Sequence, residues 1–157
     1  MWEALEELSW VKTMGSTGWI YTTISVTHYV TMFWFIGSIA FVDLRIMGLA
    51  ARDRNIGELS RELFPWTWIG FALSMISGFL MFSTAAGEWA PSKHFHYKLA
   101  FIAVSVLFAV IVQKSAPKWS EPTETPSAAK LIALVSLLLW VATIVSGSLI
   151  PALEGLG

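Results

Sequence analysis

The stretch from Ser25 to Leu49 most limits how this chain can fold. It is apolar for long enough to cross a bilayer, for which about 20 residues suffice. Yet it contains His28 near one end and Asp43 and Arg45 near the other. Aliphatic and aromatic side chains are stable in lipid, whereas an imidazole or a carboxylate there needs a partner. We therefore expect a membrane-spanning helix whose polar side chains meet other protein groups or a bound ligand.

The composition of the whole chain agrees with a membrane protein. Of its 157 residues, 55% are hydrophobic and only 13% are charged, whereas a soluble domain carries roughly 25% charged residues. The chain has no cysteine, which excludes disulfides, thiolate metal sites, iron–sulfur clusters and covalently attached haem. The net charge of −1 gives no reason to expect nucleic acid as a partner.

The apolar segments predict an all-α protein, a four-transmembrane-helix bundle that forms one membrane domain over residues 1–157. The expected spans are residues 19–51, 63–86, 95–113 and 130–153. Residues 1–12 predict a short amphipathic helix, which is too short to cross and is expected to lie in the membrane interface.

Two residues help to place the helix ends. Pro65 is expected in the first turn of the second span, because proline is tolerated there. Ser92 is a candidate N-cap for the third span, because a serine hydroxyl can accept a hydrogen bond from a backbone N–H of the first turn.

The distribution of Lys and Arg predicts the orientation. Seven of these residues lie in or beside the connections between spans one and two and between spans three and four, and three lie on the other face. The positive-inside rule then places both connections in the cytoplasm and both termini in the periplasm of a bacterial inner membrane.

In this orientation the three histidines, His28, His94 and His96, all lie toward the outer face. Imidazole is a common metal ligand, and two facing helices that each offer one can hold a b-type haem between them. His28 on span one and His96 at the start of span three are the candidate axial ligands. His94 and His96 are two residues apart and cannot share one helical face.

A haem also needs a flat slot and cations for its propionate groups. Gly70, Ser74 and Gly78 recur every fourth residue on span two. This face of small residues favours close helix packing and also leaves room for a flat cofactor. Lys93 and Lys98 lie where outward-pointing propionates would be.

Other uses of these residues stay open. His28 could be a buried histidine bonded to a neighbouring hydroxyl or carbonyl group. His94 and His96, with Glu88 nearby, could bind copper or zinc at the outer surface. A methionine could replace one histidine as a haem ligand. The candidates are Met32, Met75 and Met81.

Two further groups are expected to be structural. Asp43 and Arg45 do not face each other on a helix, so each is expected to bond another helix or a connection. A proton or ion path is the alternative for this pair. On span four, Thr143, Gly147, Ser148 and Pro151 form a small or polar stripe suited to close helix contact.

The chain resembles an uncharacterised family of small bacterial four-helix membrane proteins. The resemblance rests on the first-span histidine with Gly37-Ser38 and residues 43–49 (DLRIMGL), on residues 65–72 (PWTWIGFA) with Ser77-Gly78, and on Phe95-x-x-Lys98. It covers roughly residues 19–113. The family is distantly similar to b-type cytochromes and to copper-resistance-D-type membrane proteins, and this likeness implies haem or copper.

Three functions follow from these patterns. The first is a b-type electron carrier, with haem held between spans one and three near the periplasmic face. The second is a cofactor-free accessory subunit of a larger membrane complex. The third is a copper-binding, metal-binding or transport protein. All three predict lipid contact and a homo-oligomer or a larger complex rather than a stand-alone enzyme.

Overall fold

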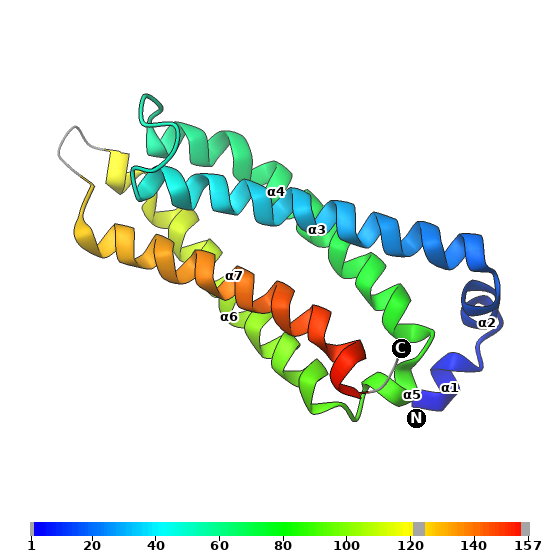
Figure 1. The fold of residues 1–157 in the computed structure, drawn as a ribbon. Coiled ribbons are helices and arrows are strands. Elements are labelled where there is room, and N and C mark those ends of the chain that lie inside the picture. The colour runs from blue at the N-terminus through cyan, green and yellow to red at the C-terminus, as the bar shows by residue number, and fades with distance from the viewer. Residues whose placement is uncertain (1, 121–124, 155–157) are drawn as a thin grey trace.

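The computed structural model describes residues 2–120 and 125–154, with side chains described as far as Ser148. Its four long helices are α3 (Gly18–Ile46), α4 (Ile56–Ser83), α6 (Lys93–Ser115) and α7 (Ser127–Glu154) (Figure 1). Each is long and apolar enough to cross a membrane, and the described residues form no strand. The prediction of an all-α protein with four membrane helices is therefore confirmed.

The starts of two spans are set by polar caps. The Asn55 side-chain oxygen accepts hydrogen bonds from the backbone N–H groups of Gly57 (2.9 Å) and Glu58 (3.1 Å). The cap begins α4 seven residues before the expected start at 63, so that Pro65 lies inside the helix and not in its first turn. The Ser92 hydroxyl accepts from the N–H of Phe95 (3.2 Å) and caps α6, as predicted.

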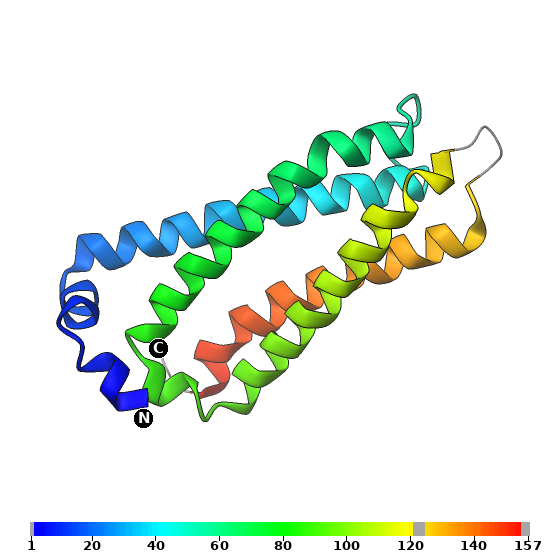
Figure 2. The ribbon, with the colours of Figure 1, turned by 180° about the vertical axis from the view of Figure 1, so that it is seen from behind.

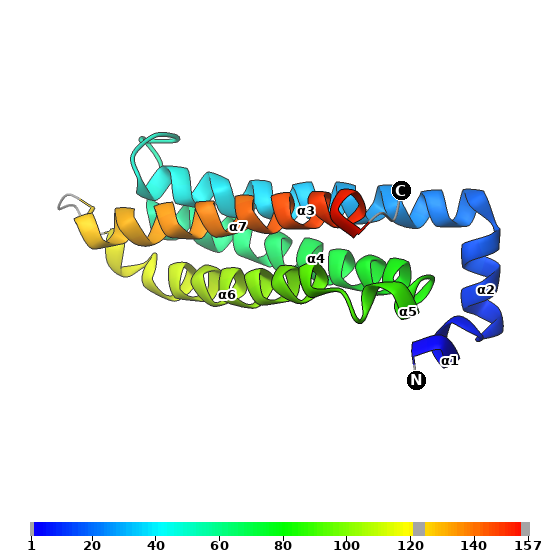
Figure 3. The ribbon, with the colours of Figure 1, turned by 60° about the horizontal axis from the view of Figure 1, so that its bottom comes forward.

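The N-terminal segment forms two short helices, α1 (Trp2–Glu6) and α2 (Ser9–Ser16), where the sequence predicted one over residues 1–12. Both lie at the end of the bundle that also holds the short α5 (Ala86–Trp89) (Figure 3). A Glu6 carboxylate oxygen accepts a hydrogen bond from the backbone N–H of Gly87 (2.6 Å) and joins α1 to α5. We call this the α5 end, and the opposite end, which holds the 3-10 helix η1 (Lys118–Ser120), the η1 end.

The four spans form two pairs, α3 with α4 and α6 with α7. Helix α3 also packs on α7, whereas α4 touches α6 at few points. Helices α3 and α7 lie close together near the η1 end and separate toward the α5 end (Figure 2). Near the η1 end the Trp68 indole N–H of α4 donates to the Gln113 side-chain oxygen of α6 (2.9 Å).

The buried core follows this divergence. One cluster near the η1 end joins all four spans, and its members are Val42, Ile46, Ile56, Phe64, Val112, Ala116, Ala129 and Ala133. A second cluster lies further along and contains Phe35, Ile36, Ile39, Ala109 and Trp140. On α3 every fully buried residue lies at or after Phe35. The bundle is thus tightly packed toward the η1 end and more open toward the α5 end.

Large apolar side chains cover the outside of the spans. Trp19 is 73% exposed, and Phe33 (64%) and Leu131 (61%) are similar. Soluble monomers rarely expose so large an apolar surface, and lipid is the natural solvent for it. The protein is a multi-pass membrane protein in contact with lipid.

Candidate functional site

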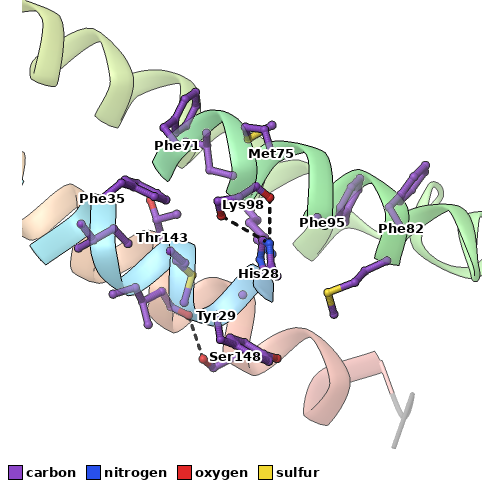
Figure 4. A pocket seen from close by; sticks show the side chains of 18 of the residues that line it. His28, Tyr29, Phe35, Phe71, Met75, Phe82, Phe95, Lys98, Thr143 and Ser148 are labelled. Carbon is purple, nitrogen blue, oxygen red and sulfur yellow. Dashed lines mark hydrogen bonds between the residues drawn. The ribbon is translucent and has the colours of Figure 1, made fainter. Parts of the chain in front are cut away.

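A cavity lies between the four spans in the half of the bundle nearer the α5 end. Its volume is about 160 Å³, close to that of an engineered apolar cavity of about 150 Å³ that binds benzene. Side chains from α3, α4, α5, α6 and α7 line it (Figure 4). Its aromatic walls include Phe35, Phe71, Phe82, Trp89, Phe95 and Trp140.

His28 on α3 presents its imidazole to this cavity. Its Nδ1 lies 2.9 Å from the Ser74 carbonyl oxygen and 3.2 Å from the Ser77 hydroxyl oxygen, both on α4. A carbonyl oxygen only accepts hydrogen bonds, so Nδ1 carries the proton and donates it. In the neutral ring Nε2 then holds a lone pair, and within the described residues it has no hydrogen-bond partner. Imidazoles that bind metals through one nitrogen are commonly oriented by such a bond from the other.

A glycine makes room for this ring. A Cβ atom on Gly78 would lie 3.0 Å from His28 Cε1 and 3.3 Å from Nδ1. Two turns earlier, a Cβ on Gly70 would lie 3.1 Å from Trp34 Cδ1 and 3.2 Å from Phe35 Cβ. The small residues of α4 therefore allow α3 to approach closely. Gly70 makes room for Trp34 and Phe35, and Gly78 makes room for the His28 imidazole.

Lys98 on α6 lines the same cavity. Its Nζ and Cε lie 3.3 Å from the position that a Cβ would take on Gly147 of α7, and it is close enough to His28 for an electrostatic interaction. The ion pairs formed in the described part of the chain are Lys12–Glu7 and Arg54–Glu62, so no carboxylate there pairs with Lys98. The cavity thus combines a free imidazole nitrogen with an unpaired ammonium group.

The other candidate ligands from the sequence divide into two groups. Met32, Met75 and Met81 line the cavity with His28. His96 does not: its side chain is exposed, and its Nδ1 bonds the Ser92 carbonyl oxygen of its own helix turn (2.8 Å). The reason is helical geometry, because Phe95 and Lys98 face the cavity and His96 is rotated about 100° from Phe95.

His94 and Lys93 also lie outside the cavity lining. The His94 ring contacts Tyr97 edge-on at 6.4 Å, and Lys93 is exposed. Of the predicted site residues, the cavity brings together His28, Ser74, Gly78 and Lys98. Within the described residues no three His, Asp or Glu side chains are grouped in a way that could hold a metal ion.

Aromatic rings close the cavity at the α5 end. Phe82 of α4 and Phe95 of α6 stack with ring centroids 5.1 Å apart, and Trp89 of α5 meets Phe95 edge-on at 6.2 Å. Trp2 of α1 packs edge-on against Phe82 at 5.7 Å. Helix α1 thus contacts one of the rings at this end of the cavity.

The Asp43-x-Arg45 pair lies elsewhere, at the η1 end of α3. The Arg45 Nε donates to the Arg54 carbonyl oxygen in the connection to α4, as expected. Asp43 faces Ser136 on α7, so it meets another helix as expected, but neither of its carboxylate oxygens makes a hydrogen bond of acceptable geometry among the described residues.

The comparison with known protein families covers almost the whole chain. Residues 2–152 match a family described as a family of unknown function, DUF6644. The chain belongs to this family. No curated protein and no solved structure matches it. Membership of an uncharacterised family agrees with the sequence resemblance, and the function has to be argued from the cavity.

The sequence did not indicate the contribution of α7 to the cavity. Trp140, Thr143 and Gly147 line it with spacings of three and four residues, which places them on one helical face. Thr143 and Gly147 were expected to serve helix contact, and Trp140 was one of several aromatic residues with no distinguishing neighbour. The i, i+3, i+7 spacing indicates that the three residues share one face of the helix. It does not indicate whether that face packs on another helix or lines a cavity.

Proposed function

We propose that the cavity binds a b-type haem with His28 as an axial ligand, and that the protein is a membrane electron carrier. The observation that carries this proposal is the hydrogen bond from His28 Nδ1 to the Ser74 carbonyl oxygen, which leaves Nε2 available as a ligand inside a mainly apolar cavity. A bound haem would supply an iron that gains and loses one electron.

The other lining residues suit the parts of a haem. Lys98 offers a positive charge for a propionate carboxylate, and the aromatic walls suit the faces and edges of the macrocycle. Since His96 lies outside the cavity, we assign the second axial position to one of the three lining methionines, because a Met/His pair is an established haem ligand set. The distant similarity of the sequence to b-type cytochromes is likewise only a part of this proposal.

The size of the cavity adds a requirement. A volume of about 160 Å³ suits one small ring, and a haem is several times larger. Binding therefore requires the helix pairs to separate further at the α5 end. This movement disturbs little of the core, because both buried clusters lie from Phe35 toward the η1 end of α3.

The direct test is the reduced-minus-oxidised absorption spectrum of protein purified from cells with a full haem supply. We expect the α band of a b-type haem in the wild type and its loss in His28→Ala. His96→Ala is the matched control, because this exposed histidine bonds only its own helix, and it should keep the band. A colourless wild-type protein would refute the proposal and, if other chains co-purify with it, would favour an accessory subunit.

The charge distribution supports the orientation. We propose that the α3–α4 connection and the η1 end lie in the cytoplasm of a bacterial inner membrane, with both termini periplasmic, because Lys and Arg concentrate in these connections. Electrons would then pass between a quinol or a membrane enzyme and a periplasmic acceptor, within an oligomer or larger complex. A C-terminal reporter that is active only in the periplasm tests the orientation, and an inactive reporter would reverse it.

A further inference from the structure

Four buried polar atoms lie without a hydrogen-bond partner between α3 and α7. They are both carboxylate oxygens of Asp43, the Ser136 hydroxyl oxygen and the Trp140 indole nitrogen, and they are the complete set of such side-chain atoms among the described residues. Asp43 and Ser136 are 0% exposed and Trp140 is 1% exposed. Native proteins rarely leave such groups unsatisfied, so this concentration at one interface requires an explanation.

The three residues are neighbours in the bundle. Ser136 on α7 interacts with the Asp43 carboxyl group across the interface, although no hydrogen bond of acceptable geometry joins them. Trp140 lies one helical turn after Ser136, and residues at i and i+4 share a face. The surrounding residues are apolar, with Val42 and Ile46 on α3 and Ala133 on α7 fully buried nearby.

Among the described residues, no basic side chain forms an ion pair with Asp43. The side chains paired with carboxylates in the described part of the chain are Lys12 and Arg54, whose partners are Glu7 and Glu62. Arg45, the closest basic residue along α3, is bonded to the Arg54 carbonyl oxygen. Within the described residues, no charged side chain therefore satisfies these polar atoms.

The hydrogen-bond donors and acceptors of these three side chains indicate what kind of ligand can bind between them. The Asp43 carboxylate oxygens accept hydrogen bonds, the Trp140 N–H only donates, and the Ser136 hydroxyl does both. A metal cation would leave the indole N–H unsatisfied and repel it. A water molecule donates and accepts at once and can complement all three side chains. We propose that Asp43, Ser136 and Trp140 bind internal water at the α3–α7 interface.

The proposed water site lies beside the cavity. Trp140 belongs to both, since it also lines the cavity. Ser136, Trp140, Thr143 and Gly147 follow one another on α7 at spacings of four, three and four residues, along one face. Thr143 and Ser105 of α6 share a hydrogen bond of 3.3 Å, and Gly147 meets Lys98. Polar side chains of Ser136 and Thr143 therefore lie along this face of α7 between Asp43 and Lys98.

Hydroxyl-radical footprinting with mass spectrometry tests the water site on the wild-type protein in lipid nanodiscs. Radicals formed from water oxidise an aromatic side chain that contacts internal water even when that side chain is buried. We expect Trp140 to be oxidised, while Phe64, which is 1% exposed and lies in the apolar core, is not. A soluble tryptophan-containing peptide added to the sample reports the radical dose. An unmodified Trp140 beside an oxidised peptide would overturn the proposal.

Two substitutions at Asp43 identify the source of that water. Asp43→Asn keeps polar atoms at the site and should preserve the oxidation of Trp140. Asp43→Leu fills the site with an apolar side chain and should reduce it several-fold. Equal oxidation in Asp43→Leu would show that Trp140 is reached only from the cavity, and would refute the site. If that variant does not fold, Ser136→Val takes its place, because it also adds apolar volume at the site, and unchanged oxidation there has the same meaning. The experiment needs no haem, so its outcome is independent of the proposed function.

Discussion

At the scale of single residues, the position of the His28 imidazole depends on the absence of a side chain at Gly78. A Cβ there would lie 3.0 Å from His28 Cε1, which is tighter than most Cβ contacts in proteins. The imidazole would have to move away from α4, and its hydrogen bond to the Ser74 carbonyl would lengthen or break. The glycine and the histidine therefore form one unit, although 50 positions separate them in the sequence.

We expect Gly78→Ala to weaken this unit. Alanine is favoured over glycine inside a helix by about 1 kcal/mol, and Gly37→Ala should gain up to that amount because nothing lies within 4 Å of its Cβ position. The Gly78→Ala protein should not show this stabilisation, and it should bind less haem. Thermal unfolding in detergent and haem content measure the two effects. Equal shifts in Tm with unchanged haem content would show that the ring does not need the space.

Lys98 should show opposite effects on stability and binding. An unpaired ammonium group in a mainly apolar cavity opposes folding, so we expect Lys98→Met to raise the free energy of unfolding of the empty protein by about 1–3 kcal/mol. The same substitution should weaken haem binding, because the charge that meets a carboxylate is lost. Lys93→Met is the control, since Lys93 is exposed outside the cavity, and its stability should change by less than about 0.5 kcal/mol.

At the scale of elements, apolar length was enough to predict the four spans, and local caps decided where two of them begin. The Asn55 cap starts α4 at Ile56, in a stretch whose charges suggested a connection. Residues 56–62 can extend the helix because its buried side, Ile56, Leu59 and Ser60, continues the helical period. Hydropathy identifies the part of a helix that crosses the hydrocarbon. It does not identify helical turns that extend beyond the membrane.

The contact between α1 and α5 is a second element-level feature, and it should respond to a single charge. Glu6→Gln weakens the charge-assisted hydrogen bond to the Gly87 N–H, at a cost of about 1 kcal/mol. We expect the Gly87 amide to exchange with deuterium faster in this variant. Glu7→Gln should leave that rate unchanged, because Glu7 pairs with Lys12 at the surface. Equal exchange in all three proteins would mean that Trp2 and Phe82 alone hold α1.

At the scale of the whole molecule, the bundle is a pair of helix pairs that are joined by buried clusters at one end and surround a cavity toward the other. The small alanines Ala116, Ala129 and Ala133 allow close approach near the η1 end. Toward the α5 end, histidine, lysine and bulky aromatic side chains occupy the space between the spans. This arrangement predicts where the molecule can open.

Distances between spin labels test that prediction, and the absence of cysteine in the chain makes labelling specific. We expect haem loading to lengthen the distance between labels at Val26→Cys of α3 and Val145→Cys of α7, both exposed near the cavity. Labels at Phe41→Cys and Leu134→Cys, exposed beside the buried clusters, should keep their distance. Lengthening of both pairs would show that the clusters near the η1 end do not hold the bundle together.

The fold class, the number of spans and the presence of polar side chains that need partners could all be predicted from the amino-acid order, because they depend on apolar length and on the cost of burying single groups in lipid. Which of those groups meet could be seen only in the folded bundle. Folding brought His28 to the Ser74 carbonyl and into the same cavity as Lys98, left His96 on the outside, and placed Asp43 opposite Ser136. The physical reason is rotation: a helix turns 100° per residue, so depth in the membrane can be read along the chain. The side that each residue faces is set by packing with the other helices.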